Sequence, residues 1–252
     1  MTDPQIQAYD SAIFDPVTRD WYGSSDFYNV GYWSSSTLTQ AEASTALVNR
    51  LLDCHTQYPT AVLDVGCGLG ATTSAIKHRW PDAHVIGINL SEAQLDYCRR
   101  NHGDCDFAMM NATDLQFSDN AFDVIFSAEA AFHFNTRINF LKQAYRSLKP
   151  GGSLLLCDIL LDRDHPFSRK MLAWDALANL DQSSPDNYKA CLEDLGYRNI
   201  LVEDATEQTW RSWIRRLIHQ TEVNGAAVPH MKLLDPNRSS VVTYYVLVSA
   251  KK

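Results

Sequence analysis

The segment from Val62 to Gly70 constrains the fold of this chain more than any other. It reads VLDVGCGLG: an apolar run ends in an aspartate, and glycine then occupies every second position. Such a run, followed by a glycine-rich loop and a helix over Ala71–Arg79, predicts a strand–loop–helix unit. Glycine has no Cβ, so a ligand can lie directly against the loop, and the helix N-terminus presents amide groups to it. The alternative is a plain turn whose glycines serve only the backbone.

Composition argues against several classes of partner. The chain has 252 residues and a net charge of −8, without any run of basic residues. Nucleic acid is therefore not an expected partner, because phosphate binding needs clustered Lys and Arg. The longest apolar stretches are only as long as strands, which predicts no membrane span. Six cysteines occur without C-x-x-C pairs, which favours free thiols in a reducing cytoplasm and no metal site.

Strand-like and helix-like segments alternate along most of the chain. This order predicts an α/β fold, with a parallel sheet and helices on both faces. Helices are expected over Leu38–Cys54 and Asn135–Leu148, and the sequence Lys-Pro-Gly-Gly should end the second one. The expected strands are Ala61–Val65, His84–Ile88, Asp106–Met109, Ala121–Ser127, Ser153–Cys157, Tyr197–Glu203 and Ser240–Ser249.

One structural domain is expected, with an N-terminal lid and first helix over 1–56 and a core over 57–252. The lid is suggested by the aromatic residues among the first 33 positions, which are Tyr9, Phe14, Trp21, Tyr22, Phe27, Tyr28, Tyr32 and Trp33. Two stretches, at about 159–196 and 205–237, exceed ordinary connections and should form a cap above the strand ends. They should contain helices over Ser168–Leu180 and Thr209–Val223.

Three stretches together resemble the class I S-adenosylmethionine-dependent methyltransferases. They are VLDVGCGLG, GINLSEAQLDYC and FHFNTRINFLKQAYRSLKPGGSLLLCDIL. The spacing D-x-G-x-G-x-G differs from the G-x-G-x-x-G that serves a pyrophosphate in dinucleotide-binding proteins. The chain is similar to the small-molecule branch (methyltransferase type 11), whose members methylate sugars, polyketides, sterols or tocopherols. The resemblance implies a Rossmann-like sheet of seven strands, mostly parallel with the last antiparallel, and S-adenosylmethionine as the cofactor.

The resemblance also implies which residues meet the cofactor. Asp64 should bond within the loop or reach the cofactor ammonium. Asn89 stands where such enzymes carry an acid for both ribose hydroxyls, and Asn111 where an aspartate usually holds the adenine amino group. The expected cofactor-binding residues are Tyr28, Asp64, Gly66, Cys67, Gly68, Gly70, Asn89, Leu90, Gln94, Asn111, Ala112 and Ser127.

Candidate catalytic residues follow the fourth and fifth expected strands. Methyl transfer requires an aligned acceptor, and a base where that acceptor carries a proton. Glu129 and His133 are four residues apart, so one helical turn would put them on one face. His133 is the expected general base because its reference pKa lies near neutrality; the alternative is a histidine that only bonds the chain or lines the cofactor site. Glu129 should orient His133, touch the cofactor or stabilise a substrate cation. Asp158 should assist the base, bind a substrate hydroxyl or cap the next segment.

The expected function is O-methylation of a small, largely apolar metabolite in secondary metabolism. The first alternative is C-methylation of an isoprenoid or indole, in which the aromatic residues and Glu129 would stabilise a cation. An alternative from another class is a non-catalytic protein that binds adenosylmethionine. The sequence leaves the acceptor unnamed and leaves a homodimer open.

Overall fold

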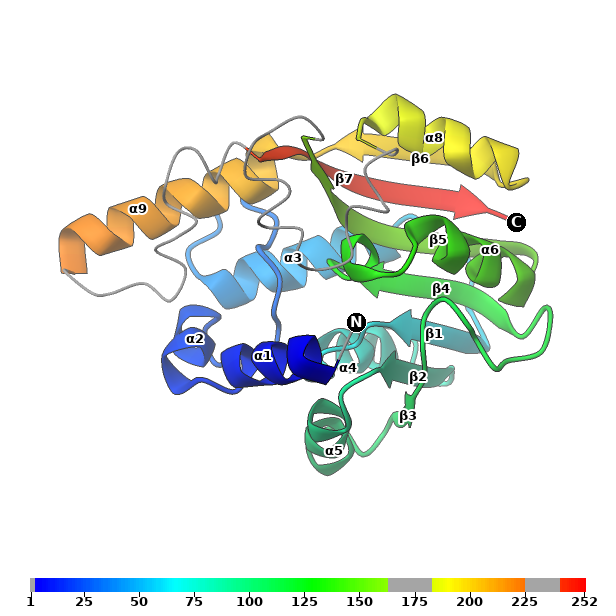
Figure 1. The fold of residues 1–252 in the computed structure, drawn as a ribbon, viewed down its shortest axis with the longest axis horizontal. Coiled ribbons are helices and arrows are strands. Elements are labelled where there is room, and N and C mark those ends of the chain that lie inside the picture. The colour runs from blue at the N-terminus through cyan, green and yellow to red at the C-terminus, as the bar shows by residue number, and fades with distance from the viewer. Residues whose placement is uncertain (1–2, 163–182, 225–240) are drawn as a thin grey trace.

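The computed structural model describes residues 3–162, 183–224 and 241–252. They form a seven-stranded sheet in the order β3-β2-β1-β4-β5-β7-β6 (Figure 1). Neighbouring strands are parallel from β3 to β5, whereas β7 runs antiparallel to β5 and β6. The expected Rossmann-like fold class is confirmed. The strands are β1 Ala61–Val65, β2 His84–Asn89, β3 Asp106–Met109, β4 Phe122–Ala128, β5 Leu148–Leu161, β6 Arg198–Asp204 and β7 Val242–Lys251.

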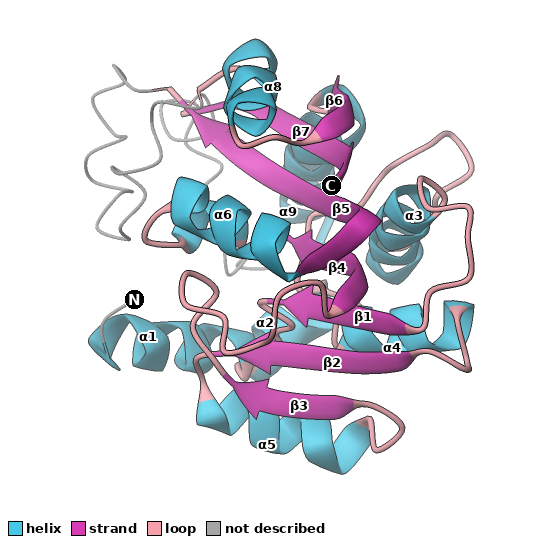
Figure 2. Cartoon of the chain, turned by 90° about the vertical axis from the view of Figure 1, so that its right-hand side faces the viewer, coloured by secondary structure: helices cyan, strands magenta, loops and turns pink. Residues whose placement is uncertain are grey.

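Helices cover both faces of the sheet (Figure 2). Alternate residues of a strand point to opposite faces, so Val62 joins a core with α3, α4 and α9, and its neighbour Leu63 joins a second core with α6 and α8. The helices are α1 Asp3–Ile13, α2 Pro16–Trp21, α3 Gln40–Leu52, α4 Ala71–Arg79, α5 Glu92–Asn101, α6 Arg137–Ser147, α8 Pro185–Asp194 and α9 Ser212–Asn224, with shorter turns at η1 Ala131–His133 and η3 Glu207–Arg211.

Strand β5 is longer than the sequence suggests. It was expected to begin at Ser153, after a Pro-Gly-Gly stop, but it already pairs with β4 at Leu148. The pairing then jumps from Phe122 with Leu148 to Val124 with Ser153. The residues between form a bulge instead of a turn, and a proline is tolerated there because a bulge need not donate to the ladder.

Helix boundaries differ from expectation for local reasons. α6 begins at Arg137 because the side chain of Thr136 caps it, accepting a hydrogen bond from the backbone of Asn139. The helix expected over Thr209–Val223 is two segments, the π-helical turn η3 and then α9. The helix expected over Ser168–Leu180 lies outside the described residues, as does part of each expected cap stretch.

The N-terminal arm, residues 3–33, lies across the carboxyl ends of the parallel strands. Figures 1 and 2 both show α1 at that edge of the sheet. The far end of the arm is fastened by two backbone bonds, from Tyr32 N to Ala43 O at 2.8 Å and from Trp33 N to Gln208 O at 2.7 Å. The arm is therefore packed against α3 and η3, with α1 held near the strand ends.

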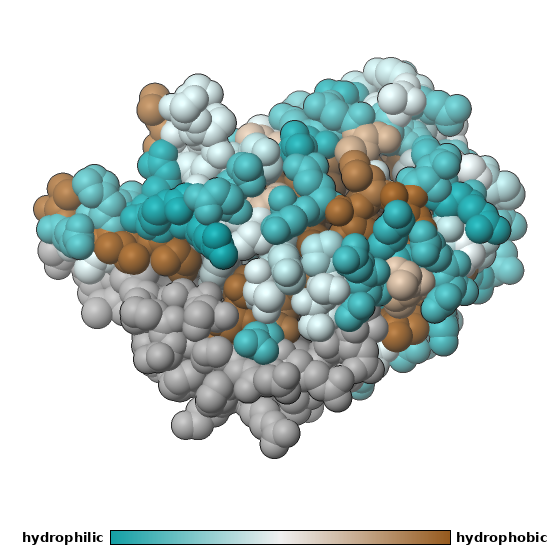
Figure 3. Space-filling model, turned by 90° about the horizontal axis from the view of Figure 1, so that it is seen from above, coloured by the Kyte–Doolittle hydropathy of each residue, from teal (hydrophilic) through white to brown (hydrophobic). Residues whose placement is uncertain are grey.

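The surface above α8 and α9 is mostly hydrophilic, with apolar side chains in a strip along α9 (Figure 3). Ile218 and Val223 are exposed members of that helix. Within the described ranges, no helix combines the length and hydropathy that a bilayer crossing requires.

Asp158, expected to face the pocket, lies in the core and does not line the cavity. Its carboxylate is fully buried and accepts a hydrogen bond from Arg137 Nε at 2.6 Å. The hydroxyl of Tyr188 and the backbone of Ile159 donate to it as well, at 3.1 and 2.9 Å. A buried carboxylate needs such partners, and these come from α6, α8 and β5, so the pair joins three elements of the second core.

Replacing Arg137 with methionine should lower the free energy of unfolding by about 3–5 kcal/mol, because it leaves a buried carboxylate without its counter-ion. Urea unfolding measures the loss. Arg99→Met is the matched control: Arg99 pairs with Glu92 and Asp96 on the surface, and its replacement should leave the free energy of unfolding close to that of wild type. Similar small losses in both variants would contradict a structural role for the buried pair.

Candidate active site

A cavity of about 440 Å³ opens at the carboxyl ends of β1, β2 and β4. Open α/β sheets bind their ligands at this edge. One side of α1 forms part of the cavity wall. The lining residues are Ile6, Tyr9, Ile13, Tyr28, Val65, Gly66, Gly68, Ile88, Asn89, Leu90, Ser91, Gln94, Met110, Asn111, Ala112, Thr113, Ala128, Glu129, Ala130, His133, Phe134 and Asn135.

The glycine-rich loop forms one wall as bare backbone. Gly66 and Cys67 donate their amides to the carbonyl of Ile88 at 2.9 and 3.1 Å, which ties the loop to β2. Gly68 has a φ of 55°, and a Cβ built there would have only Ile13 Cδ1 near it, at 3.9 Å. A side chain at this position would thus project into the cavity, so the wall accepts a ligand only while it stays glycine.

Asp64 closes the loop from beneath. It is 1% exposed, and its Oδ2 accepts a hydrogen bond from the hydroxyl of Thr73 at 2.6 Å. Burial raises the pKa of Asp64 to about 7, and the Thr73 bond opposes that rise. Asp64 thus bonds across the loop to α4, and its side chain is not among those that line the cavity.

A polar wall lies opposite, where β2 meets α5. Asn89 donates from Nδ2 to Gln94 Oε1 at 2.8 Å, and its own Oδ1 accepts from the backbone of Leu90 at 2.7 Å. Gln94 turns its NH₂ group to Asp10 of α1, at 2.7 Å, and Ser91 donates its hydroxyl to the same oxygen at 2.7 Å. An acidic residue from the N-terminal arm therefore bonds two residues of this wall.

Beyond β3 the wall continues through residues 110–113. The side-chain oxygen of Asn111 accepts bonds from the backbone and hydroxyl of Thr113, both at 3.0 Å. This Asx turn fixes the amide of Asn111 beside Ala112 and Met110, which also line the cavity. The polar and apolar groups here suit an aromatic base with an amino substituent.

Glu129 follows β4 directly and carries a strained backbone, with a φ of 50°. Such left-handed residues cost roughly 1–3 kcal/mol and cluster at functional sites. Its Oε1 accepts from Tyr245 Oη at 2.6 Å and from the backbone of Val30 at 2.9 Å. Glu129 lines the cavity, and burial raises its pKa to about 7 although these two bonds oppose the rise.

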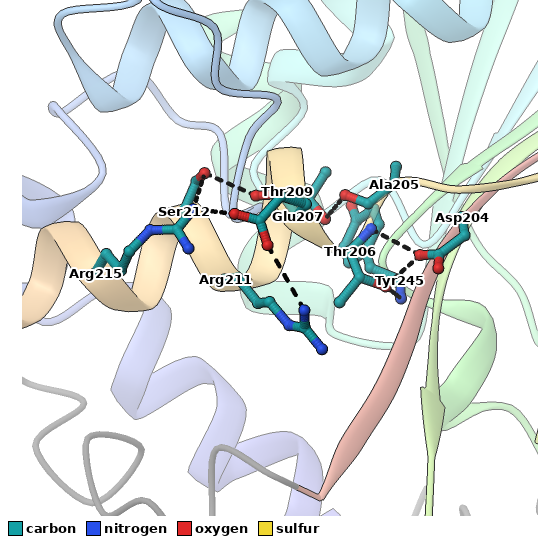
Figure 4. Close-up of polar contacts among 9 residues, drawn as sticks. All are labelled: Asp204, Ala205, Thr206, Glu207, Thr209, Arg211, Ser212, Arg215 and Tyr245. Atoms are coloured by element: carbon teal, nitrogen blue, oxygen red, sulfur yellow. Dashed lines mark hydrogen bonds and ion pairs between the residues drawn. The ribbon is translucent and has the colours of Figure 1, made fainter.

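Tyr245 is itself held by the junction of β6 with η3 (Figure 4). Its backbone N–H donates to Thr206 Oγ1 at 2.8 Å, and its carbonyl accepts from Ala205 N at 2.8 Å. Thr206 in turn donates its hydroxyl to Asp204. The late strands thus position the hydroxyl that contacts Glu129.

His133 belongs to the 3₁₀ turn η1, three residues beyond Ala130. It is 7% exposed, and burial lowers its pKa to about 3, so the imidazole is neutral at ordinary pH. Its Nε2 lies 3.2 Å from Tyr9 Oη, and the two rings meet edge to face at 5.3 Å. The expectation that one helical turn joins Glu129 and His133 is wrong, because a strand end and a 3₁₀ turn separate them, yet both line the cavity.

The cavity gathers most of the expected site residues: Tyr28, Gly66, Gly68, Asn89, Leu90, Gln94, Asn111, Ala112, Glu129 and His133. Others stand behind the wall. Ser127 donates to Val65 O at 2.9 Å, and Cys67 packs against Leu95 and Cys98. Gly70 faces His102, and Asp158 lies in the second core.

Residues of α1 were missed as site residues by the sequence analysis. Ile6, Tyr9 and Ile13 line the cavity, and Asp10 bonds two residues that do. Their spacing along a helix that begins at Asp3 is the signal that could have pointed to them.

Known proteins share this sequence pattern. Residues 63–156 match the family described as a methyltransferase domain. Erythromycin 3''-O-methyltransferase of Saccharopolyspora erythraea is 30% identical over 205 residues, which cover 75% of this chain and 67% of that protein. O-methyltransferase rstn1 of Aspergillus nomiae is 30% identical over 190 residues, which cover 71% of this chain and 83% of that protein.

The chain belongs to the S-adenosylmethionine-dependent methyltransferases. Its cofactor is S-adenosylmethionine, as expected. Phosphoethanolamine N-methyltransferase 1 of Triticum aestivum is 31% identical over 170 residues, but that match covers 66% of this methyltransferase and only about a third (34%) of the plant enzyme.

Solved structures share the fold of this methyltransferase. The geranyl diphosphate C-methyltransferase of Streptomyces coelicolor A3(2) superposes with a TM-score of 0.73 at 18% identity, covering 98% of this chain and 96% of that one. The [4+2]-cyclase SpnF gives 0.72 at 20% identity, covering 97% and 94%. Proteins named for different reactions share this architecture, so the reaction has to be argued from the site.

Gly68→Val should abolish binding of adenosylhomocysteine, because the side chain would occupy the cavity. Gly151→Val is the matched control: Gly151 also has a positive φ, 79°, and open space around it. Both variants should lose about 1–2 kcal/mol of stability through left-handed strain. Calorimetric titration should show lost affinity for adenosylhomocysteine in the Gly68 variant alone. Equal affinity in both variants would contradict a role of the loop in cofactor binding.

Glu129→Gln should gain stability relative to wild type as the pH rises from about 5 to about 8. The folded protein holds the Glu129 proton up to a pKa of about 7, whereas the unfolded chain releases it at the usual, lower pKa. The retained proton stabilises the folded wild type, and this contribution to the free energy of unfolding is lost as the pH rises through 7. Glutamine has no such proton, so the stability of the variant does not change in this way. Asp64 shifts similarly but is present in both proteins, so it cancels. Thermal unfolding across this range is the measurement, and a pH-independent difference would contradict the raised pKa.

Proposed function

We propose that this methyltransferase transfers a methyl group to a hydroxyl of a small, largely apolar metabolite, with His133 as general base. The observation that carries the proposal is the buried, neutral imidazole of His133, whose Nε2 lies 3.2 Å from Tyr9 Oη at the cavity wall. The similarity to erythromycin 3''-O-methyltransferase supports hydroxyl acceptors in natural product biosynthesis.

The cavity residues fit the cofactor by their chemistry. The open backbone at Gly68 suits the amino acid portion, and the polar wall where β2 meets α5 suits the ribose. Asn111, Ala112 and Met110 suit the adenine. When bound, S-adenosylmethionine supplies a methyl group that is already activated on a sulfonium. The protein therefore has to orient the acceptor, exclude water and remove a proton.

His133 is suited to remove that proton. Because burial lowers its pKa to about 3, the imidazole keeps a lone pair at neutral pH. An oxygen that gains a methyl group becomes positively charged and strongly acidic, so even a weak base can take its proton. Tyr9 Oη lies within hydrogen-bond distance of Nε2 and the two rings meet edge to face, so Tyr9 orients the imidazole.

A second candidate is C-methylation through a cationic acceptor, and Glu129 is the observation that favours it. Its carboxyl stands near Tyr9 and Tyr28, and its charge raises the pKa of both phenols after burial, that of Tyr28 to about 12. A carboxylate among aromatic rings stabilises a cation. The fold is shared with geranyl diphosphate C-methyltransferase, which is consistent with this candidate.

We also propose a cytoplasmic location. All six cysteines are free thiols, and Cys67, Cys98 and Cys157 are buried. Free thiols persist in a reducing compartment.

His133→Ala should lower kcat by about a hundredfold or more while affinity for adenosylhomocysteine stays near wild type, because only proton removal is lost. Labelled S-adenosylmethionine and a panel of hydroxylated macrocycles and phenols provide the assay. His55→Ala is the matched control, since His55 is a buried histidine bonded to Ser153 away from the cavity.

The pH dependence of kcat, together with the two variants, separates O-methylation from C-methylation. His133 ionises far below neutrality, so kcat should show no His133 ionisation between about pH 5 and pH 9. Any ionisation near 7 should vanish in Glu129→Gln. A His133→Ala variant with nearly full turnover, combined with a large loss in Glu129→Gln, would overturn O-methylation in favour of a cationic acceptor.

A further inference from the structure

The ribose end of the cofactor site lacks its usual acid. In Rossmann-like folds a carboxylate at the end of the second strand accepts hydrogen bonds from ribose hydroxyls. β2 of this methyltransferase ends in Asn89, a neutral amide. That amide is already engaged, with Nδ2 on Gln94 and Oδ1 on the backbone of Leu90. A charged acceptor for the ribose therefore has to come from elsewhere, or the site has none.

A carboxylate of α1 bonds two residues of this wall. Asp10 Oδ1 lies 2.7 Å from Ser91 Oγ and 2.7 Å from Gln94 Nε2. Both partners line the cavity and are nearly fully buried, at 3% and 4% exposure. Asp10 follows Tyr9 directly, and Ile6 and Ile13 flank it on the cavity side of the same helix.

The N-terminus of a helix also meets this carboxylate. Ser91 is the N-cap of α5, so the carboxylate stands at the positive end of a helix dipole. Gln94 points its Oε1 to Asn89 and its NH₂ to Asp10. The two bonds together fix which way the side-chain amide of Gln94 faces. Both of these bonds use Oδ1; within the described part of the chain, Oδ2 of Asp10 has no hydrogen-bond donor.

We propose that Asp10 is the ribose-binding acid of this methyltransferase, with Oδ2 accepting from a ribose hydroxyl of S-adenosylmethionine or adenosylhomocysteine. Asp10 of the N-terminal arm thus takes the ribose-binding role that an acid at the end of β2 usually has. This inference rests on the cofactor site proposed above and not on the identity of the acceptor. In this proposal α1 binds the cofactor directly, in addition to forming part of the cavity wall.

The test is the affinity for adenosylhomocysteine, measured by calorimetry on the full chain. Asp10→Asn keeps the size of the side chain and removes the charge, and affinity should fall at least about tenfold because charge-assisted bonds are the strong ones. Asp20→Asn is the matched control: Asp20 is an exposed acid of the same arm, in α2, and its change should leave affinity intact. Thermal unfolding of each variant confirms that it is folded.

A ligand series tells a ribose contact from a simple fastening of α1. The 2′-deoxy and 3′-deoxy forms of adenosylhomocysteine each lack one hydroxyl. If Asp10 binds the ribose, one of these analogues should bind wild type and Asp10→Asn almost equally. If the loss in Asp10→Asn is the same for all three ligands, Asp10 only fastens α1 to α5, and the inference is overturned.

A second-site variant provides an independent check. Asn89→Asp alone should weaken binding, because two carboxylates would then compete for the amide of Gln94 and repel one another. In Asp10→Asn the same change should restore affinity, since it returns the acid to β2. Failure of the double variant to recover would overturn the exchange of roles. If wild type itself does not bind adenosylhomocysteine, the cofactor site and the proposed function both fail, which is a separate outcome.

Discussion

One buried hydrogen bond holds the glycine-rich loop in the shape that the cavity requires. Asp64 ends β1, Thr73 lies in the first turn of α4, and their side chains meet at 2.6 Å beneath the loop. Glycine-rich backbone is costly to order, so a loop of this composition keeps one shape only when it is tied at both ends. The burial that raises the pKa of Asp64 also makes this bond hard to replace, because no water can substitute for Thr73. The wall of the cavity and the position of Ile13 above Gly68 both depend on it.

Local sequence patterns were sufficient for most of the sheet. β1 and α4 could be recognised because an apolar run, a glycine-rich loop and a helix follow one another without interruption. α5 could be recognised because Ser91 caps it. β5 could not, since Pro-Gly-Gly normally ends an element, and only the register with β4 turns that stretch into a bulge. Pairing between distant strands depends on the whole sheet, and no local pattern carries it.

In the cavity, too, some features could be predicted from the sequence and others could not. Residues at the carboxyl ends of β1, β2 and β4 were predictable, because parallel strands end at one edge of a sheet. The environment of His133 was not, since its low pKa results from burial by elements far away in the chain, including Tyr9 of α1. Asp158 looked similar to Glu129 in sequence, as an acid after a buried strand, yet its partners Arg137 and Tyr188 assign it to the core. Charge partners of this kind become visible only in three dimensions.

Tyr9 and Asp10 are neighbours on α1, and they contact different parts of the cavity wall, Tyr9 at η1 and Asp10 at α5. A helix moves as a stiff body, so both contacts form or break in the same motion. Departure of a spent cofactor past α1 would then cost three hydrogen bonds at once, at about 0.5–1.5 kcal/mol each. Slow detachment of this one helix would make product release the slowest step of turnover and adenosylhomocysteine a strong product inhibitor.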